Sequence, residues 1–216
     1  IWFRQAAEQE GRIAINLIGD AFSDAMRQQA IDAIRQQLGQ VDLVIYSLAS
    51  GIRVLPDGRQ VRSVLKTTGQ PFSGWGLDLE QDTLVQQSLA PATPEEIRDT
   101  VTVMGGEDWQ LWLQALQQAD CLAPGAQTVA YSYIGPESTY PLYRDGTIGY
   151  AKEHLHATAE TINLQLAEIG GHAWVSVCKA LVTNASAYIP VLPVYLGLLM
   201  GVMKERGVHE GCIEQM

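Results

Sequence analysis

Two short apolar runs separated by an amphipathic pattern constrain the fold most. Residues 11–20 (GRIAINLIGD) and residues 41–50 (VDLVIYSLAS) are short and rich in branched side chains, which is typical of buried parallel strands. Between them, apolar residues recur every four positions, as on one face of a helix: Met26, Ala30, Ile34 and Leu38. A strand, a helix and a second strand in this order predict a parallel sheet of the α/β class.

The alternation of strands and helices continues along the chain. We expect a third strand at residues 126–134, a long helix between Gly146 and Gly170, and a fourth strand at residues 172–183. Together these elements predict a Rossmann-like, doubly wound parallel sheet in a single domain over residues 1–216.

Capping residues mark two of the helix starts. Ser23 is the expected N-cap of the first helix. Thr93, Pro94 and Glu96 form a capping box with proline at the first helical position, so a second helix is expected to begin there. A third helix, ending before Pro124, has one apolar face that we expect in the core: Trp109, Trp112, Leu113 and Leu116.

Residues 51–90 interrupt this order, and we interpret them as an insertion. The turn at residues 56–58 (Pro-Asp-Gly) lies between two apolar segments that we expect to pair as a hairpin. The later stretch GQPFSGWG, residues 69–76, is rich in glycine and is expected to be irregular.

Composition and charge argue against several classes of protein. A net charge of -10 without any basic run argues against a nucleic-acid partner. His154 and His156 are two apart on a helix and face different sides, so we expect no metal site there.

Residues 1–10 lack the apolar core of a signal peptide, which favours a cytoplasmic protein. Three widely spaced cysteines suggest neither a disulfide framework nor a zinc site, and we expect them to pack as small apolar side chains: Cys121, Cys178 and Cys212.

Residues 181–203 carry no charge and are long enough to span a bilayer. Pro190 and Pro193 interrupt this stretch, and we expect no stable membrane insertion. We favour an apolar helix that lines an acyl pocket, and a wholly buried core helix is an equal alternative. The residues on successive turns of that helix are Tyr188, Leu192, Tyr195 and Leu199.

Tyr143 and Lys152 form the candidate catalytic pair. A phenol beside an ammonium can donate a proton, because the positive charge stabilises the phenolate and lowers the pKa of the phenol. This suits a reaction that passes through an enolate. The nine residues from Tyr143 to Lys152 would turn through about 900° on one regular helix and point the two side chains to opposite sides. We therefore expect Tyr143 on a loop, and the helix that carries Lys152 to begin after Gly146.

A ligand crevice is expected where the parallel strands end. Asp20 and Ala21 follow the first predicted strand, and Leu48 and Ala49 end the second. In open α/β sheets, ligands bind beyond the carboxyl ends of the strands. These four residues are therefore expected to meet at one binding site.

Four motifs occur together in the chain: DLVIYSLAS, MGGEDW, YSYIGPE with the Tyr143 and Lys152 pair, and HEGCIEQ. Their joint occurrence, in family-like order and separation over essentially the whole chain, resembles the trans-2-enoyl-CoA reductases, also called FabV-type enoyl-ACP reductases. The resemblance implies a divergent short-chain dehydrogenase fold. It also implies reduction of the 2,3 double bond of a trans-2-enoyl thioester, on CoA or on acyl carrier protein, by NADH in fatty acid synthesis.

The resemblance also implies roles for single residues. Tyr143 would donate a proton or stabilise the enolate, and Lys152 would hold the nicotinamide ribose while its charge favours the phenolate. Tyr133 would contact the substrate. Besides Lys152, the implied cofactor contacts lie at three strand ends: Asp20, Ala21, Leu48, Ala49, Leu181, Val182 and Thr183.

The family pattern extends beyond both ends of this sequence. The glycine-rich phosphate loop with its strand and helix is expected before residue 1, so we expect a truncated Rossmann-like domain that binds NADH poorly and has little activity alone. The residue that selects NADH over NADPH is expected there too. We expect a monomer. Two alternatives to the reductase stay open: a non-catalytic nucleotide-binding module of the same fold, and a protein that residues 181–203 attach to a membrane.

Overall fold

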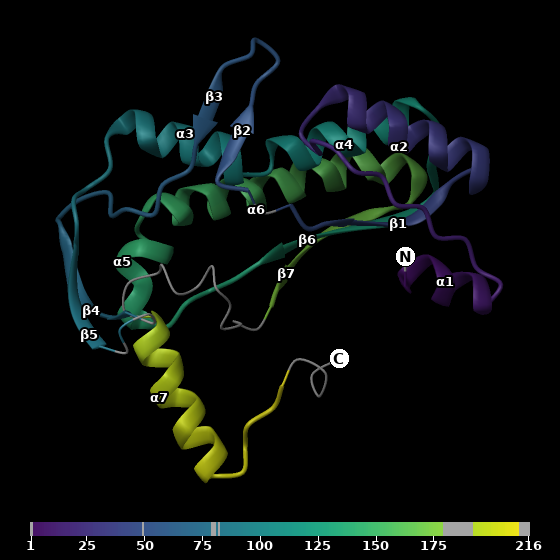
Figure 1. The fold of residues 1–216 in the computed structure, drawn as a ribbon. Helices are drawn as coiled ribbons and strands as arrows, with labels where there is room; N and C mark the ends of the chain where they lie inside the picture. Colours follow the sequence, from purple (N-terminus) through teal and green to yellow (C-terminus); the bar gives the residue numbers. More distant parts are fainter. Residues whose placement is uncertain (1, 49, 79–80, 82, 179–191, 212–216) are drawn as a thin grey trace.

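A three-stranded parallel sheet lies at the centre of the computed structural model (Figure 1). The structure describes residues 2–48, 50–78, 81, 83–178 and 192–211. Strand β1 (Val41–Tyr46) pairs with β6 (Leu122–Ser132), and β6 pairs with β7 (His172–Val177), all in parallel. The predicted parallel sheet of the α/β class is confirmed, although β6 begins four residues earlier than predicted. The predicted end of the fourth strand, residues 179–183, lies outside the described residues.

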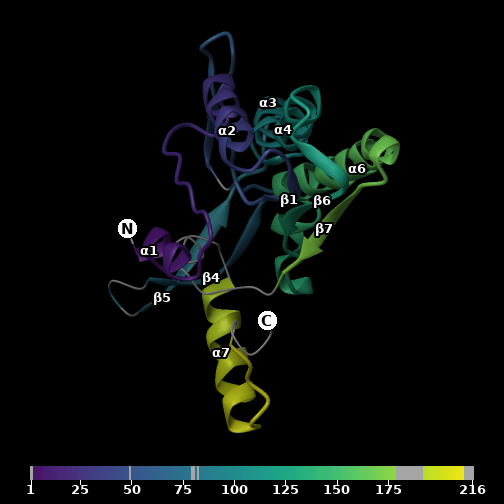
Figure 2. The same cartoon turned by 90° about the vertical axis from the view of Figure 1, so that its right-hand side faces the viewer.

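Four helices pack over one face of this sheet (Figures 1 and 2). They are α2 (Asp24–Gln37), α3 (Pro94–Met104), α4 (Glu107–Gln118) and α6 (Thr147–Leu166). From Ala126 to Ser132 the side chains of β6 alternate, and every second one is buried, as a period of two requires. The core between the layers includes Ile31, Trp109, Leu113, Ala130, Leu155, Ile162 and Leu166. Trp109 is buried as predicted, whereas Trp112 is only partly buried.

Both predicted helix caps are present. The Ser23 hydroxyl accepts the Met26 N–H at 3.1 Å. The Thr93 hydroxyl accepts the Glu96 N–H at 3.2 Å, and the Glu96 carboxylate accepts the Thr93 N–H at 2.8 Å, so the capping box is complete. Helix α4 ends well before Pro124, because Asp120 adopts a left-handed backbone conformation with φ of 56°.

The insertion contains two antiparallel hairpins. Strands β2 (Ile52–Val54) and β3 (Gln60–Arg62) pair around Gly58, which confirms the predicted hairpin. Strands β4 (Phe72–Asp78) and β5 (Thr83–Leu89) form the second hairpin. The prediction that residues 69–76 are irregular is therefore wrong for most of this stretch. The pairing partner of β4 follows it in the chain, so local glycine content does not reveal the strand.

The prediction of a strand at residues 11–20 is also wrong. After α1 (Trp2–Gln9), residues 12–18 form no strand, and Ile18 is 95% exposed. Ile13, Ile15 and Leu17 instead line a shallow pocket with apolar residues of α2. Alternating apolar residues suit a strand, but a strand also needs a neighbour for its backbone N–H and C=O groups. Within the described residues, no strand pairs with this segment.

Three short helices and α7 complete the described structure. The 3-10 helix η1 (Glu137–Thr139) leads into α5 (Tyr140–Tyr143), and η2 (Ala167–Ile169) follows α6. Helix α7 (Leu192–Glu205) lies beside the β4–β5 hairpin (Figures 1 and 2). No helix among the described residues has both the length and the apolar character needed to cross a membrane.

The cysteines do not share one environment. Cys121 is fully buried in the core, as predicted. Cys178 is exposed just after β7, so the prediction of apolar packing is wrong there, because the position follows the last residue of the strand. Cys212 lies outside the described residues.

Candidate functional site

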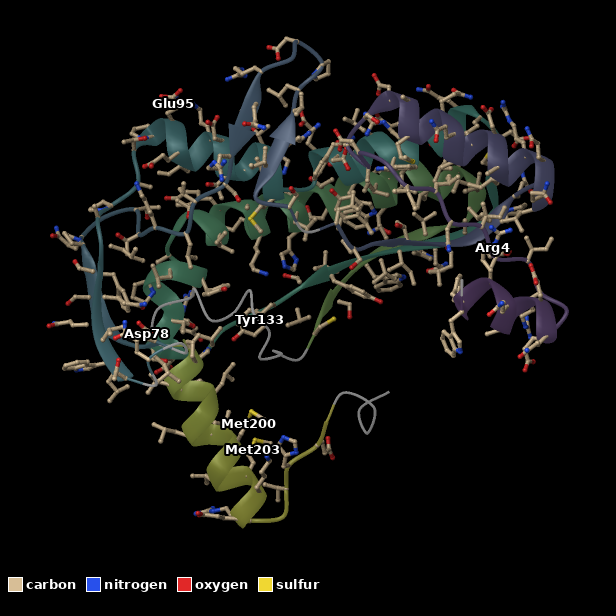
Figure 3. The ribbon with its side chains drawn as sticks, in the orientation of Figure 1. Arg4, Asp78, Glu95, Tyr133, Met200 and Met203 are labelled. Atoms are coloured by element: carbon tan, nitrogen blue, oxygen red, sulfur yellow. The ribbon has the colours of Figure 1, made fainter. Side chains whose placement is uncertain are left out.

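The end of β6 places the first two residues of the candidate site. Ser132 is the last strand residue and belongs to the buried face that Thr128 and Ala130 also occupy. Lys152 on α6 approaches this strand end from the helical layer, and its Nζ donates to the Ser132 hydroxyl at 3.0 Å. Tyr133 follows Ser132, and its side chain lies on the same side of the sheet as α7 (Figure 3). The strand end thus holds Lys152 close to Tyr133.

Tyr143 is the last residue of α5, and a separate helix carries Lys152. Pro141 lies in the first turn of α5, and the helix closes after Tyr143, where the Arg144 N–H donates to the Tyr140 carbonyl at 2.9 Å. Gly146 is extended and begins α6. The predicted break between Tyr143 and Lys152 is confirmed, although Tyr143 belongs to a one-turn helix and not to a loop.

Tyr133, Tyr143 and Lys152 line one pocket of about 350 Å³. The Tyr133 and Tyr143 rings meet edge to face with their centres 5.4 Å apart, and Lys152 Nζ lies 6.0 Å from the centre of the Tyr133 ring. Tyr133 therefore contacts both members of the candidate pair. Within the described residues, no hydrogen bond joins the Tyr143 hydroxyl to Lys152. Other residues lining the pocket include Ser132, Tyr140, Arg144, Gly149, Glu153 and His156.

Burial determines the protonation of this pocket. It raises the pKa of Tyr143 to about 12, with a further contribution from Tyr133, because a buried phenolate loses its hydration. It also raises the pKa of Tyr133, and lowers the pKa of Lys152 to about 8. The prediction that Lys152 lowers the pKa of Tyr143 is wrong in this structure, because desolvation outweighs any attraction between the two groups. At neutral pH the phenol keeps its proton and can donate it.

A second pocket, of about 310 Å³, lies at the end of β1. Asp20, Ala21 and Leu48 line it together, as predicted, although Asp20 and Ala21 follow no strand in the described structure. The predicted contacts Ala49 and residues 181–183 lie outside the described residues. Lys152 lines the Tyr143 pocket and not this one.

Helix α4 fixes the walls of the second pocket through contacts that the sequence did not indicate. The indole N–H of Trp112 donates to the Ala21 carbonyl at 3.1 Å. Asp108 accepts from Arg27 Nη1 at 2.9 Å and from the Tyr46 hydroxyl at 3.2 Å. The loop that carries Ala21 and the end of β1 are thereby joined to one helix. No sequence pattern distinguishes a buried carboxylate such as Asp108 from the exposed acidic residues that usually begin a helix.

Comparison with known proteins decides which family has this site. The family model described as the trans-2-enoyl-CoA reductase catalytic region matches residues 1–216. The chain belongs to the trans-2-enoyl-CoA reductase family. The resemblance inferred from the four motifs is therefore confirmed, and with it the Rossmann-like fold.

Relatives of this reductase chain are known in sequence and in structure. A Photobacterium profundum protein named enoyl-acyl-carrier-protein reductase (NADH) 2 is 55% identical over 218 residues, which cover 100% of this chain and 54% of the relative. The Treponema denticola trans-2-enoyl-CoA reductase in complex with NAD has a TM-score of 0.92 at 50% identity, covering 99% of this chain and 53% of that one. The Clostridium acetobutulicum enzyme in complex with NADH has a TM-score of 0.94 at 46% identity, covering 100% and 55%. The chain spans about half the length of the curated relatives it matches.

Proposed function

We propose that the protein containing this chain reduces the 2,3 double bond of trans-2-enoyl thioesters with NADH. The observation that carries the proposal is the single pocket lined by Tyr133, Tyr143 and Lys152 in a member of the reductase family. A phenol that keeps its proton at neutral pH is a suitable acid for such a reaction. A monomeric state and a cytoplasmic location stay predictions from the sequence.

The crevice at the end of β1 would hold one part of NADH, and Lys152 would hold another. The crevice at Asp20, Ala21 and Leu48 combines a carboxylate with apolar walls, which suits a base and its polar edge. The Lys152 ammonium has three donors and a partner at Ser132, and it would bind ribose hydroxyls. NADH, when bound, would supply the hydride that reaches the β carbon of the substrate.

The roles of the two tyrosines follow from their place in the pocket. The Tyr143 hydroxyl would donate its proton, or a hydrogen bond, to the enolate that forms when the β carbon is reduced, and the α carbon then gains a proton. Tyr133, whose ring packs edge to face on Tyr143, would contact the thioester.

Helix α7 is proposed to line the acyl end of the pocket. Tyr195 on α7 lies near enough to Tyr133 to contribute to the raised pKa of that phenol, after burial itself. Leu192 and Leu196 are buried on the same helix. The proximity of Tyr195 to Tyr133 supports the acyl-pocket interpretation of the uncharged segment, while the burial of Leu192 and Leu196 suits a buried core helix equally. Tyr188 lies outside the described residues.

Consumption of NADH with a short trans-2-enoyl-CoA tests the proposal directly. The assay uses the protein at the length of its curated relatives, and the same acyl group on acyl carrier protein distinguishes the two carriers. We expect thioester-dependent loss of NADH absorbance and formation of the saturated thioester. NADH binding without turnover on either carrier would instead support the non-catalytic nucleotide-binding alternative.

The ammonium of Lys152 gives NADH binding an expected pH dependence. Because burial lowers the pKa of Lys152 to about 8, its charge is present below that pH and is lost above it. NADH affinity of the free protein should therefore fall as pH rises through about 8. Lys152→Arg keeps its charge in this range and should show a flatter profile. Fluorescence titration with NADH measures the affinity of both proteins at each pH. If Lys152→Arg has the same pH profile as the unmodified protein, Lys152 is not the origin of the pH dependence.

A further inference from the structure

Residues 64–68 of the insertion run past the point where α5 ends and α6 begins. We name this segment the strap. Thr67 of the strap and Gly146 form an isolated antiparallel bridge. The Thr147 N–H donates to the Lys66 carbonyl at 2.9 Å, and the Thr68 hydroxyl donates to the Asp145 carbonyl at 2.6 Å. The strap therefore contacts the residues that separate Tyr143 from the helix of Lys152.

Thr147 is the centre of this contact. Its side chain is fully buried at the first residue of α6. The hydroxyl donates to the Val64 carbonyl at 2.5 Å and accepts the Lys66 N–H at 3.2 Å. Loss of this hydroxyl would remove the hydrogen bonds that it makes to a part-buried carbonyl and a part-buried N–H, which is costly. Thr147 thus ties the start of α6 to two backbone groups of the strap.

The strap is held on its other side by α3. The Val64 N–H donates to the Thr100 hydroxyl at 3.0 Å, and Lys66 Nζ bonds the Glu96 carboxylate at 2.5 Å. Helix α3 in turn packs against α6. The strap is therefore hydrogen-bonded to both α3 and α6, beside the residues that separate α5 from α6.

The residues between the end of α5 and the first turn of α6 are tightly packed. A Cβ atom on Gly146 would lie 2.5 Å from the Leu142 carbonyl oxygen and 2.6 Å from the Lys66 carbonyl oxygen. A Cβ atom on Gly149 would overlap the Arg144 carbonyl oxygen. Helix α5, the strap and the first turn of α6 are thus in direct backbone contact. A shift of the strap would move α5, and Tyr143 with it.

We propose that the strap positions Tyr143, and that Thr147 is the positioning residue that sets α5 against α6 so that the phenol faces the Lys152 pocket. The kinetic consequence rests on the proposed reductase function. The structural consequence, an α5 held in place by the Thr147 hydroxyl, does not. The insertion then acts on the active site although none of its described residues lines the Tyr143 pocket.

Substitution of Thr147 by Val and by Ser tests the proposal, because Val keeps the shape of the side chain and Ser keeps its hydroxyl. We expect Thr147→Val to lower kcat about tenfold or more, as a misplaced catalytic group does, with KM for NADH changed less than about twofold. Thr147→Ser should stay within about threefold of the unmodified protein. Hydrogen exchange, followed by mass spectrometry, should be faster at residues 140–146 in the Val variant alone.

Thr158→Val is the matched control. Thr158 is also buried on α6, but its hydroxyl donates to the His154 carbonyl of its own helix. We expect this variant to change neither kcat nor exchange at residues 140–146. If Thr147→Val does not fold, Thr68→Val removes only the bond to Asp145 and should give a smaller change of the same kind.

Two outcomes would overturn the proposal. Unchanged exchange at residues 140–146 in Thr147→Val, or in Thr68→Val if the first variant does not fold, would show that the strap does not hold α5, whatever the activity. Faster exchange with unchanged kcat per folded molecule would show that the strap does not position Tyr143. An unmodified protein without turnover would contradict the proposed function, and the exchange measurement would still decide whether the strap holds α5.

Discussion

Tyr143→Phe is expected to lower kcat for enoyl thioester reduction by about 100-fold to 10,000-fold, the range that a general acid contributes. The variant keeps the aromatic ring that packs edge to face on Tyr133 and removes only the hydroxyl. Because Tyr143 is not among the residues at the Asp20 crevice, NADH affinity should change little. Steady-state kinetics with a short trans-2-enoyl-CoA, together with NADH titration, measure both quantities.

Tyr140→Phe provides the matched control for this experiment. Tyr140 lies on the same short helix and lines the same pocket, but its ring packs beneath the Arg144 guanidinium at 4.9 Å. Removal of the Tyr140 hydroxyl should change kcat less than about threefold, since no step of the proposed reaction uses that hydroxyl. Near-normal turnover in Tyr143→Phe would remove Tyr143 from the mechanism. Equal losses in both variants would point to the shape of the pocket and not to a proton donor.

The sequence predicted the elements whose patterns are local. The capping residues of α2 and α3, the strands β1 and β6, and the break after Tyr143 were all predicted from residues close together in the chain. The failures involve pairing with a second strand, which the pattern of one segment alone does not reveal. Residues 12–18 have the pattern of a strand but no paired neighbour in the described structure, and β4 is a strand because β5 pairs with it.

Some features of the candidate site could also be predicted from the sequence, and others needed the folded structure. Motif resemblance gave Tyr133, Tyr143 and Lys152, and the structure brings all three to one pocket. Neither motif nor periodicity gave the charge state of the pocket, because desolvation depends on burial that only the folded chain provides. The contact between Thr147 and the strap joins residues more than eighty positions apart, and it too is invisible in local patterns.

Arg27→Met is expected to destabilise the protein by about 3–5 kcal/mol near neutral pH, the usual cost of removing one partner from a buried ion pair. Arg27 and Asp108 are only 6% and 2% exposed, and the guanidinium donates to the carboxylate at 2.9 Å. Among the described residues, the side-chain hydrogen bond that Asp108 keeps without Arg27 comes from the Tyr46 hydroxyl. Denaturant unfolding measures the loss, and Arg59→Met, in an exposed pair 3.9 Å from Asp57, should cost less than about 1 kcal/mol.

The pH dependence of this loss identifies its cause. Burial already raises the pKa of Asp108, and Arg27 opposes that shift, so its removal should raise the pKa further. A carboxyl group whose folded pKa exceeds its unfolded value destabilises the folded state when it is ionised. This penalty declines as pH falls below the folded pKa and is gone below the unfolded pKa. The destabilisation by Arg27→Met should therefore be smaller at mildly acidic pH than at neutral pH, and Asp108→Asn in the same chain should abolish that dependence. A loss that is equal at both pH values would instead assign the effect to the packing of the Arg27 side chain against Trp112, whose ring lies 6.0 Å from the guanidinium.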